Sequence, residues 1–598
     1  MNWIICLMIA ALIIAASIAA AVRMRRHTRR GNKLFLSAFQ IIFAGVFCAV
    51  FVSMLPVYAQ MYQEGSGRGL KTVMSSLHTT FQVFTIDVDS EEIIESVSAQ
   101  GPMLRSLYTV YLSVIFVCAP LLTFGFIFSF VRNLSASLQY LKVYFRDLYV
   151  FSELNEKSIA LAEDLKKNDP EAGIVFADVS AEEQEGEYIE SARKLNGICF
   201  RKSISGISLY THSRKKKITL FLIGEDQTNN INLGLKLIET YQQLDNMTMY
   251  VFSTRVEGEI LLTQANRGKI RIHRVDEVRS LIYNMLYENG CSLFENAKPE
   301  GDSKKITAVI IGMGQHGTEM LKALAWYCQM DGYTLQIHAF EKDPLAEDRL
   351  TADCPELMSD TYNGKMIPGE AQYTIRVHSG MDVTTHTFVQ AVKEITDVTY
   401  VLVSLGTDEM NIRTAVDLRK VFERMHVKPA IQAIVYNPEE RKALEGITNY
   451  RGQPYQVDFI GDLQTMYSEK VILSSELERQ ALKIHLRWGK EDEFWQYEYN
   501  YRSSVASAIQ QKAREYCGIP GATKREEDLT GEERRRIESV EHRRWNAYMR
   551  SEGYIYSGSK EKSSRNDLGK MHHDLVDYDS LSDEEKRKDS RAALGQNG

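Results

Sequence analysis

The sequence predicts an α/β protein with two tandem, doubly wound parallel sheets, preceded by three transmembrane helices and followed by a small, mainly helical C-terminal domain. Three observations lead to this fold class. Long uncharged apolar runs occupy most of residues 1–131, and a helix needs about 20 such residues to cross a bilayer. β-Branched runs then alternate with helical patterns, which is typical of a parallel sheet with helices on both faces. The alternation occurs twice, each time over about 150 residues, the length of a whole domain.

Composition excludes several classes of protein. The chain has 598 residues and a formal net charge of -7, which argues against a general nucleic-acid partner. Its eight cysteines are scattered, without a C-x-x-C pair or a partnered histidine spacing. A structural zinc site or a disulfide framework is therefore not expected, and the pattern fits a reducing cytoplasm.

Residues 1–131 are predicted as a three-helix transmembrane region. Its three uncharged runs are Trp3–Val22, Leu34–Ala59 and Leu107–Val131. The short loop between the first two carries six basic residues, namely Arg23, Arg25, Arg26, Arg29, Arg30 and Lys33. By the positive-inside rule, this loop is cytoplasmic, the N-terminus and the loop 60–106 lie outside the cell membrane, and all residues after 131 are cytoplasmic.

The loop 60–106 contains a half-apolar segment, Leu70–Phe84, for which two interpretations remain open. It is either an amphipathic helix on the outer surface or the pore helix of a cation channel. In the second case Thr79 and Thr80 stand where a potassium filter begins. No glycine follows them, however, and a ring of backbone carbonyls needs glycine for its conformation.

Residues 132–147 are predicted as a helical connector and residues 148–297 as the first α/β domain. Its opening strand, Leu148–Phe151, leads through a turn into the helix Ile159–Lys166. Other residues occupy the glycine positions of a phosphate-binding turn, namely Glu153, Asn155 and Ser158. A carboxylate repels a pyrophosphate, so we expect this copy either to bind no ordinary dinucleotide or to hold one differently. Its later strands are expected at Ile174–Ala177, Ile218–Ile223, Thr248–Phe252 and Lys269–His273.

Residues 305–488 are predicted as the second α/β domain, after a polar linker at Lys298–Lys304. The buried strand Ile306–Ile311 is followed by glycines at G-x-G-x-x-G spacing and then by a helical pattern. These glycines, Gly312, Gly314 and Gly317, allow a tight turn, close approach of a pyrophosphate, and close helix packing. The next strand ends at Glu341, where a carboxylate can accept both ribose hydroxyls.

A further strand, Val398–Val403, leads into a segment that contains Asp408 and Asn411, and Gly224–Asn229 is its counterpart in the first domain. In these motifs both domains resemble the TrkA-N, or RCK, domain of potassium channels and transporters. The resemblance implies that NAD(H) or another adenine nucleotide binds to four residues, Gly312, Gly314, Gly317 and Glu341. It also implies that Asp408 and Asn411 shape the floor of the pocket.

Residues 489–598 are predicted as a helical module. A capping box at Ser475 begins the helix Ser475–Leu486, just before this module, and a second one at Thr530 begins the helix Glu533–Arg550 inside it. The second carries Glu541-His542-x-x-Trp545, and two further blocks follow, Gly553-Tyr554-Ile555-Tyr556 and a segment that begins at His572.

Three blocks in this order and spacing resemble the bacterial RyR domain, named for a repeat in ryanodine receptors. The resemblance implies a module that senses a nucleotide-derived ligand. Its candidate binding residues are His542, Trp545, Tyr548, Tyr554, Tyr556 and His572. The alternative is that these aromatic residues form the core of a small domain. We expect Arg543 and His572 to be exposed.

No nucleophile–base pair or metal-ligand spacing occurs in the sequence, so we expect neither an enzyme nor a metal site. His316, inside the glycine motif, is expected at most to add a hydrogen bond. The leading hypothesis is a homo-oligomeric, membrane-anchored sensor, in which a nucleotide or nucleotide-derived signal changes the state of the transmembrane helices, in ion conduction or membrane disruption during stress or antiviral signalling. The alternatives are a ligand-gated potassium channel or a regulatory subunit of potassium transport, and a scaffold that binds NAD for stability alone.

Overall fold

The computed structural model describes most of the chain. The described residues are 2–27, 31–63, 67–85, 87–88, 91–180, 186–207, 209, 216–255, 258–259, 261–262, 268–358, 361–362, 365–366, 372–445, 449–454, 456–519 and 528–593. Arg29 and Arg30 of the basic loop lie outside them. The chain divides into two compact units, residues 1–155 with 171–218 and residues 156–170 with 219–598.

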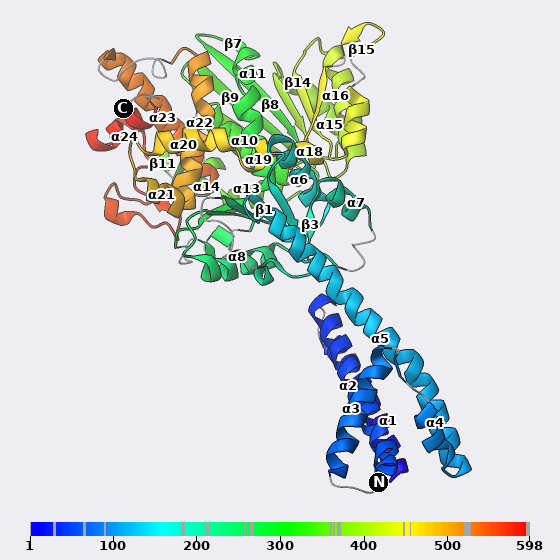
Figure 1. Ribbon diagram of the computed structural model, residues 1–598. Helices are drawn as coiled ribbons and strands as arrows, with labels where there is room; N and C mark the ends of the chain where they lie inside the picture. The colour runs from blue at the N-terminus through cyan, green and yellow to red at the C-terminus, as the bar shows by residue number, and fades with distance from the viewer. Residues whose placement is uncertain are drawn as a thin grey trace. The chain divides into compact units, whose positions relative to one another are not determined.

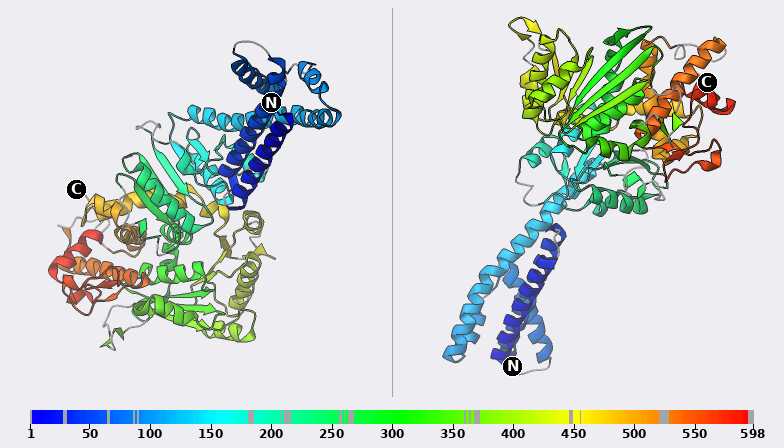
Figure 2. Two further views of the ribbon diagram at one scale, coloured as in Figure 1. Left: turned by 90° about the horizontal axis from the view of Figure 1, so that it is seen from below. Right: turned by 180° about the vertical axis from the view of Figure 1, so that it is seen from behind.

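Three N-terminal helices are long and apolar enough to cross a membrane, as predicted. They are α1 (Trp3–His27), α2 (Gly31–Met61) and α5 (Pro102–Lys142) (Figures 1 and 2). Helix α5 runs without a break through the expected connector, so the third apolar stretch and most of residues 132–147 form one rod.

Two further helices, α3 (Arg68–Thr85) and α4 (Glu91–Ser98), lie between α2 and α5 in the sequence. Helix α3 packs along α2 rather than apart from it. The Tyr58 hydroxyl lies 2.5 Å from Thr79 Oγ1, and Phe84 packs edge-on against Phe43 with ring centroids 5.1 Å apart. Both Thr79 and Thr80 are buried inside this helix, so residues 79–85 have helical backbone and form no ring-type filter. Ile86 lies outside the described residues.

The first sheet follows the order β3-β2-β1-β4-β5-β6. Its strands are β1 (Leu148–Phe151), β2 (Gly173–Phe176), β3 (Ile198–Cys199), β4 (Ile218–Leu222), β5 (Met247–Phe252) and β6 (Arg271–Val275). Among the helices that accompany them in the described residues are α6 (Glu156–Asn168), α7 (Glu187–Lys194), α8 (Gln227–Tyr241) and α10 (Glu277–Asn289). The pairs β1–β2, β2–β3 and β5–β6 are parallel, and a parallel sheet was predicted. Strand β3 and helix α7 were not predicted, because neither carries a long apolar run.

The second sheet repeats this topology with the order β12-β9-β8-β13-β14-β17 (Figure 1). Its parallel strands are β8 (Ser303–Ile311), β9 (Tyr333–Glu341), β12 (Tyr373–Ser379), β13 (Tyr400–Val403), β14 (Ala430–Ile434) and β17 (Val457–Ile460). Strand β8 is central and fully buried from Ile306 to Ile311. The expected linker is instead a hairpin, since β7 (Lys298–Glu300) pairs antiparallel with the start of β8.

Helices α12 (Gln315–Tyr327), α15 (His386–Glu394) and α16 (Asp408–Arg424) connect the strands of this sheet. Helix α12 starts directly at the glycine turn, where Gly314 is its N-cap. Its first buried residues follow at once, so the glycine turn is held between the central strand and a buried helix.

The C-terminal helices pack on the second sheet. They are α20 (Ser475–His485), α21 (Glu491–Gln496), α22 (Glu498–Tyr516), α23 (Gly531–Ser551) and α24 (Asp583–Ala593). The expected capping box at Thr530 is present. The expected box at Ser475 is wrong, because Ser474 is the N-cap and its side chain makes no capping bond.

One hydrophobic core extends from α12 into α22 and α23. The buried Trp326 of α12 packs edge-on against Tyr548 of α23, with ring centroids 6.2 Å apart. The Gln510 amide of α22 donates to the carbonyls of Tyr327 and Gln329, both at 2.9 Å. Gln510 thereby satisfies backbone oxygens that the end of a helix leaves unpaired, and residue 489 is no boundary of the core.

Candidate functional site

A cavity of about 360 Å³ lies among the C-terminal helices, within the range of small-molecule sites of about 300–1,000 Å³. Helices α22, α23 and α24 supply most of its wall, and the segment after β19 (Met571–His572) closes one side. Its aromatic lining residues are Trp488, Tyr499 and Trp545. Its polar lining includes Asn500, Ser503, Ser504, Ser507, Glu541, His542, Arg544, Lys562, Arg565, His572, His573, Asp574, Glu585, Lys588 and Asp589.

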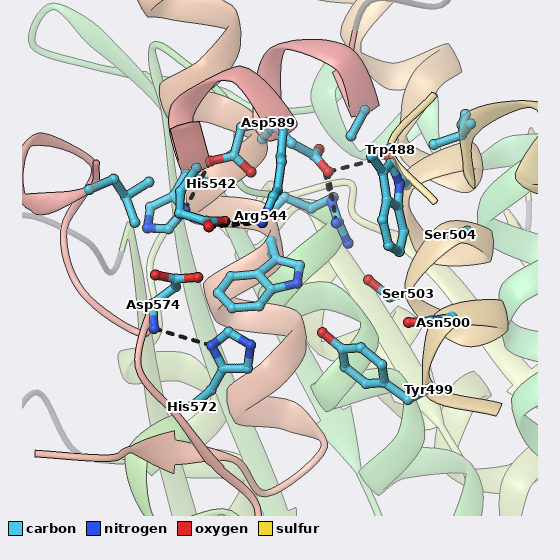
Figure 3. Close-up of a pocket in the computed structure, with 18 of the residues that line it drawn as sticks. Trp488, Tyr499, Asn500, Ser503, Ser504, His542, Arg544, His572, Asp574 and Asp589 are labelled. Carbon is cyan, nitrogen blue, oxygen red and sulfur yellow. Dashed lines mark hydrogen bonds and ion pairs between the residues drawn. The ribbon is translucent and has the colours of Figure 1, made fainter. Parts of the chain in front are cut away.

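His572 presents a hydrogen-bond donor to this cavity. Its Nδ1 accepts from the Asp574 backbone N–H at 3.1 Å. Burial, reinforced by the charge of Arg565, lowers the pKa of His572 to about 3, so the ring is neutral. A neutral ring whose Nδ1 is an acceptor carries its proton on Nε2. This Nε2–H points into the cavity (Figure 3) and has no hydrogen-bond partner among the residues that the structure describes.

Two groups of α22 face the same space. The Asn500 amide nitrogen donates to the Glu493 carbonyl at 3.2 Å, and its oxygen points into the cavity (Figure 3). The Ser503 hydroxyl is also directed inward, although the residue is only 7% exposed. Within the described chain neither the Asn500 oxygen nor the Ser503 hydroxyl has a hydrogen-bond partner, so these two groups and the His572 Nε2–H are unpaired. Arg544 Nη1 and the two ring nitrogens of His573, which also belong to the wall, make no hydrogen bond with the described residues either.

The acidic side chains of the wall are already neutralised by the protein. Glu541 forms ion pairs with Arg514 and Arg544. Burial alone would raise the pKa of Glu541, but these two guanidinium groups lower it to about 2. Glu585 accepts from Lys588 at 2.8 Å. The wall therefore offers little uncompensated charge.

His542 and Asp589 form a further pair, with Nδ1 and Oδ2 3.2 Å apart. The His542 Nε2 lies 2.8 Å from the Val576 carbonyl oxygen. Burial raises the pKa of Asp589 to about 6, although His542 opposes the shift. This pair holds α24 against α23.

The adjacent His572, His573 and Asp574 bring possible metal-ligand atoms within 4.8 Å of one another. The two imidazole rings, however, stack with centroids 4.7 Å apart and planes 11° apart. A metal ion lies near the plane of each imidazole that binds it, and two stacked rings do not share such a point. In this arrangement the two imidazoles do not converge on one metal position.

The glycine turn of the second sheet has the geometry expected from its sequence. Gly312 has φ +90°, and a Cβ there would lie 2.5 Å from the Ser404 carbonyl oxygen. A Cβ on Gly317 would lie 1.8 Å from the Gly312 carbonyl oxygen, so α12 packs directly on the turn. At Gly314 no atom lies within 4 Å of an added Cβ. The space in front of the α12 N-terminus is therefore open.

Glu341 holds this turn in place. Its Oε2 accepts from the Met313 backbone N–H at 2.6 Å, and its Oε1 accepts from Lys342 and Asp343 N–H groups at 2.8 and 3.2 Å. The strand-end carboxylate thus lies beside the glycine turn, as expected. It bonds to the protein backbone in this structure.

Asn411 and Asp408 fasten loops rather than lining an open floor. The fully buried Asn411 accepts from the Leu405 N–H at 2.5 Å and donates to the carbonyls of Leu405 and Ile434 at 3.2 and 2.8 Å. The Asp408 carboxylate accepts from the backbone N–H groups of Tyr436 and Asn437. Both side chains tie the end of β13 to the end of β14.

The first sheet contains the same arrangement, in which a buried asparagine side chain bonds to the backbone at the ends of two strands. We call this arrangement an amide latch. Asn230 accepts from the Gly224 N–H at 3.0 Å and donates to the carbonyls of Gly224 and Phe252 at 2.8 and 3.0 Å. Its counterpart is Asn411, so the two repeats align with Leu405 opposite Gly224. The alignment expected from the sequence, which paired Asn411 with Asn229, is therefore wrong by one residue.

His316 is buried beside the turn and faces Tyr436, whose hydroxyl lies 3.3 Å from its Nδ1. Burial lowers the pKa of His316 to about 4, so it is neutral near pH 7. We expected His316 to make at most one hydrogen bond, and it makes this one to Tyr436.

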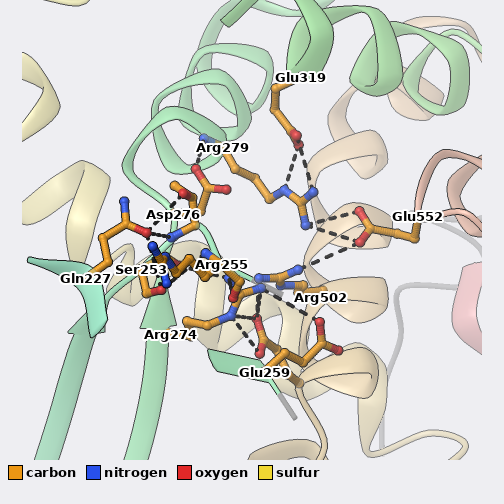
Figure 4. A network of polar contacts seen from close by, with 12 residues as sticks. Gln227, Ser253, Arg255, Glu259, Arg274, Asp276, Arg279, Glu319, Arg502 and Glu552 are labelled. Carbon is orange, nitrogen blue, oxygen red and sulfur yellow. Dashed lines mark hydrogen bonds and ion pairs between the residues drawn. The ribbon is translucent and has the colours of Figure 1, made fainter. Parts of the chain in front are cut away.

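A buried charge network joins the two sheets' helices to the C-terminal helices (Figure 4). Arg279 of α10 bonds to Glu319 of α12 at 2.7 Å and to Glu552, just after α23, at 3.1 Å. Arg502 of α22 pairs with Glu498 and lies 3.7 Å from Glu552. Helix α12 is therefore linked to α22 and α23 near both of its ends, by this network and by Gln510.

Of the six residues predicted to bind a ligand in this region, three line the cavity: His542, Trp545 and His572. The other three lie elsewhere. Tyr548 packs in the core against Trp326, Tyr554 packs against Tyr499 with ring centroids 6.0 Å apart, and the Tyr556 N–H donates to Glu356. The expectation of exposure is also wrong, since His572 is 4% exposed and the Arg543 side chain 11%.

Sequence reasoning missed the polar face of α22 and the charged face of α24. Asn500, Ser503, Ser504 and Ser507 recur at helical spacing, as do Glu585, Lys588, Asp589 and Ala592. On α22, small polar residues on an otherwise buried helix were the available signal, because such residues usually favour exposed positions.

No protein-family model matches the sequence, and no curated protein matches it. The structure by itself defines a protein with three membrane-length helices, two parallel α/β sheets and a C-terminal cavity fused to the second sheet.

Proposed function

We propose that this chain is a membrane-anchored sensor whose C-terminal cavity binds a nucleotide or nucleotide-derived signal. The observation that carries the proposal is the His572 Nε2–H, which faces a cavity lined by Trp545 and Tyr499 without a partner among the described residues. Buried polar groups are normally hydrogen-bonded, and an unpaired donor beside aromatic rings supports a flat ligand that packs against these rings and accepts a hydrogen bond. The resemblance of this region to RyR domains supports the same function.

A second, resident adenine nucleotide such as NAD(H) belongs to this proposal, at the glycine turn of the second sheet. The strand order 3-2-1-4-5-6 is that of dinucleotide-binding Rossmann folds, which is consistent with a TrkA-N or RCK relationship. The open space at Gly314 and the start of α12 fit a phosphate group. Glu341 would hold the ribose, while Gly312 and Gly317 keep the turn closed. The nucleotide would serve as a structural or regulatory ligand, and we propose no catalysis.

Binding would reach the membrane helices through the α/β sheets. Helix α22 carries cavity residues on one face and Arg502 and Glu498 of the buried network on another. A ligand can shift such a state only by its difference in affinity between two states, typically about 1–3 kcal/mol. Three helices cannot enclose a pore, so an effect on conduction or membrane integrity requires a homo-oligomer. We propose an outside N-terminus and cytoplasmic sheets.

The test is a thermal-shift titration of the full chain in detergent with NAD, ATP, ADP-ribose and cyclic oligonucleotides. We expect at least one of them to raise the unfolding midpoint, and Trp545→Ala to abolish that shift. Tyr516→Ala, an exposed aromatic substitution on the same helix bundle, serves as the matched control and should retain it. The proposal fails if no compound shifts the midpoint, or if Trp545→Ala leaves every shift intact.

A further inference from the structure

We propose that the C-terminal cavity recognises the uncharged heterocycle of its ligand, through a ring edge that carries an acceptor next to a donor, and not its phosphate. This inference rests on the proposed function and specifies the chemistry of that same site. Nucleobases present such an edge for base pairing, and proteins that bind a single base read this edge while stacking its faces on aromatic side chains.

Three of the unpaired groups of the wall, on His572, Asn500 and Ser503, supply complementary partners. The His572 Nε2–H is a donor, the Asn500 oxygen is an acceptor, and the Ser503 hydroxyl can act as either. Each orientation follows from a contact on the far side of the group. The His572 Nδ1 is occupied by the Asp574 N–H, and the Asn500 nitrogen by the Glu493 carbonyl. These contacts leave the His572 Nε2–H and the Asn500 amide oxygen for a ligand.

The aromatic residues are placed to contact a flat ring. Trp545 stands nearly perpendicular to His572, with ring centroids 4.9 Å and planes 74° apart. A ligand ring that lies in the plane of His572 can accept the Nε2–H bond. Such a ring is nearly perpendicular to Trp545 and therefore contacts it in an edge-to-face arrangement. Tyr499 adds a second aromatic ring to this part of the wall, next to Trp545 (Figure 3).

The charges of the wall argue against phosphate recognition inside the cavity. Arg544 is bound to Glu541, and Lys588 is bound to Glu585. Lys562 also contacts Glu585, at 3.3 Å, and Arg565 bonds to Asp567 at 2.9 Å. A phosphate would have to compete with a carboxylate for each cation, whereas an uncharged ring leaves every pair intact and can still accept from the unpaired Arg544 Nη1.

The test uses the intrinsic tryptophan fluorescence of the full chain in detergent. The probes are adenosine, guanosine, cytidine and uridine, with ribose 5-phosphate and inorganic phosphate as charged fragments. We expect at least one nucleoside to bind and neither phosphate fragment to do so. Its dissociation constant should change less than about twofold between about 50 and 200 mM salt, because phosphate contacts alone are strongly salt-dependent.

Variants separate recognition from folding. His572→Phe keeps a ring but removes the donor, and we expect about a tenfold loss of nucleoside affinity or more. His572→Gln restores an N–H donor and should recover part of the lost nucleoside affinity. Asn500→Asp keeps the size and removes the amide, and should weaken binding, while His386→Ala on the distant α15 should not. If His572→Phe binds as tightly as the native chain, the inference is wrong.

The two proposals fail differently. If whole nucleotides bind in a Trp545-dependent manner while nucleosides do not, or if ribose 5-phosphate binds alone, the ligand chemistry inferred here is overturned and the sensor function stands. If neither nucleotides nor nucleosides bind, both are overturned.

Discussion

The Nδ1 atom of His542 lies 3.2 Å from Asp589 Oδ2, and this contact contains a proton. The other ring nitrogen, Nε2, lies 2.8 Å from the Val576 carbonyl, which can only accept, so Nε2 carries hydrogen. Below about pH 6, the pKa of Asp589, a second proton therefore lies between Nδ1 and Oδ2. The pair as a whole is uncharged, beside the cavity wall and close to the Glu541 ion pairs.

This proton predicts a pH dependence of stability. The pKa of Asp589 is raised to about 6 by burial, against about 3.9 in an unfolded chain. The folded state therefore binds the proton more tightly, so its stabilising contribution is complete below about pH 4 and is lost as the pH rises to about 6. Asp589→Asn, which can donate to Nδ1 at any pH, should remove this contribution. The difference in unfolding free energy between native and variant chains should change by about 1–3 kcal/mol from pH 4 to pH 7; a pH-independent difference contradicts the assignment.

The buried network predicts a large penalty for removing Arg279. Arg279→Met leaves Glu319 and Glu552 buried without their shared cation, and breaking a buried pair costs about 3–5 kcal/mol. Thermal unfolding of the full chain measures this loss. The double variant Arg279→Met, Glu319→Gln should recover part of it, because one uncompensated carboxylate is gone. Additive effects of the two substitutions would contradict the coupling.

Two glycines of the same turn should respond differently to alanine. Gly317→Ala places a Cβ against the Gly312 carbonyl and should destabilise the second sheet by about 3 kcal/mol or more. Gly314 has φ -67° and open space, so Gly314→Ala should change stability by less than about 1 kcal/mol. It should nevertheless weaken adenine nucleotide binding, measured by calorimetry, because the new methyl group occupies the phosphate position. Unchanged nucleotide affinity in Gly314→Ala would remove that position as the site.

The amide latches predict where the internal repeat is aligned. Asn230→Ala and Asn411→Ala each remove three buried hydrogen bonds and should each cost about 2–4 kcal/mol. Asn229→Ala, one residue away, is the matched control and should cost less than about 1 kcal/mol. Denaturation of the three variants tests this order, and a larger loss in Asn229→Ala would restore the other alignment.

The sequence predicted the elements whose burial is total. Strand β8 and the turn into α12 were expected, because a fully apolar β-branched run followed by spaced glycines forms few structures other than a buried strand and a tight turn. The hairpin of β7 was missed, because its residues are charged and exposed and pairing along an edge leaves no apolar pattern. Strand β3, only two residues long, lies below the length at which periodicity is visible.

The cavity could be predicted in part. His542, Trp545 and His572 came from spaced motif blocks, whereas Asn500 and Ser503 belong to residue types that occur on every helix surface. Tyr548 was misjudged for a different reason. It lies on α23 three residues after Trp545, but its environment is decided by Trp326, more than two hundred positions earlier in the chain. Only the tertiary packing of α12 against α23 determines which aromatic faces the cavity.

The cap that Gln510 places on α12 has a consequence for how the protein can be dissected. A fragment that ends before α22 leaves the carbonyls of Tyr327 and Gln329 without their donor and exposes Trp326, a side chain that is 1% exposed in the whole chain. Such a fragment should aggregate when expressed alone, and the C-terminal helices without α12 should do the same. A fusion protein that contains the C-terminal helices therefore also has to contain the second sheet.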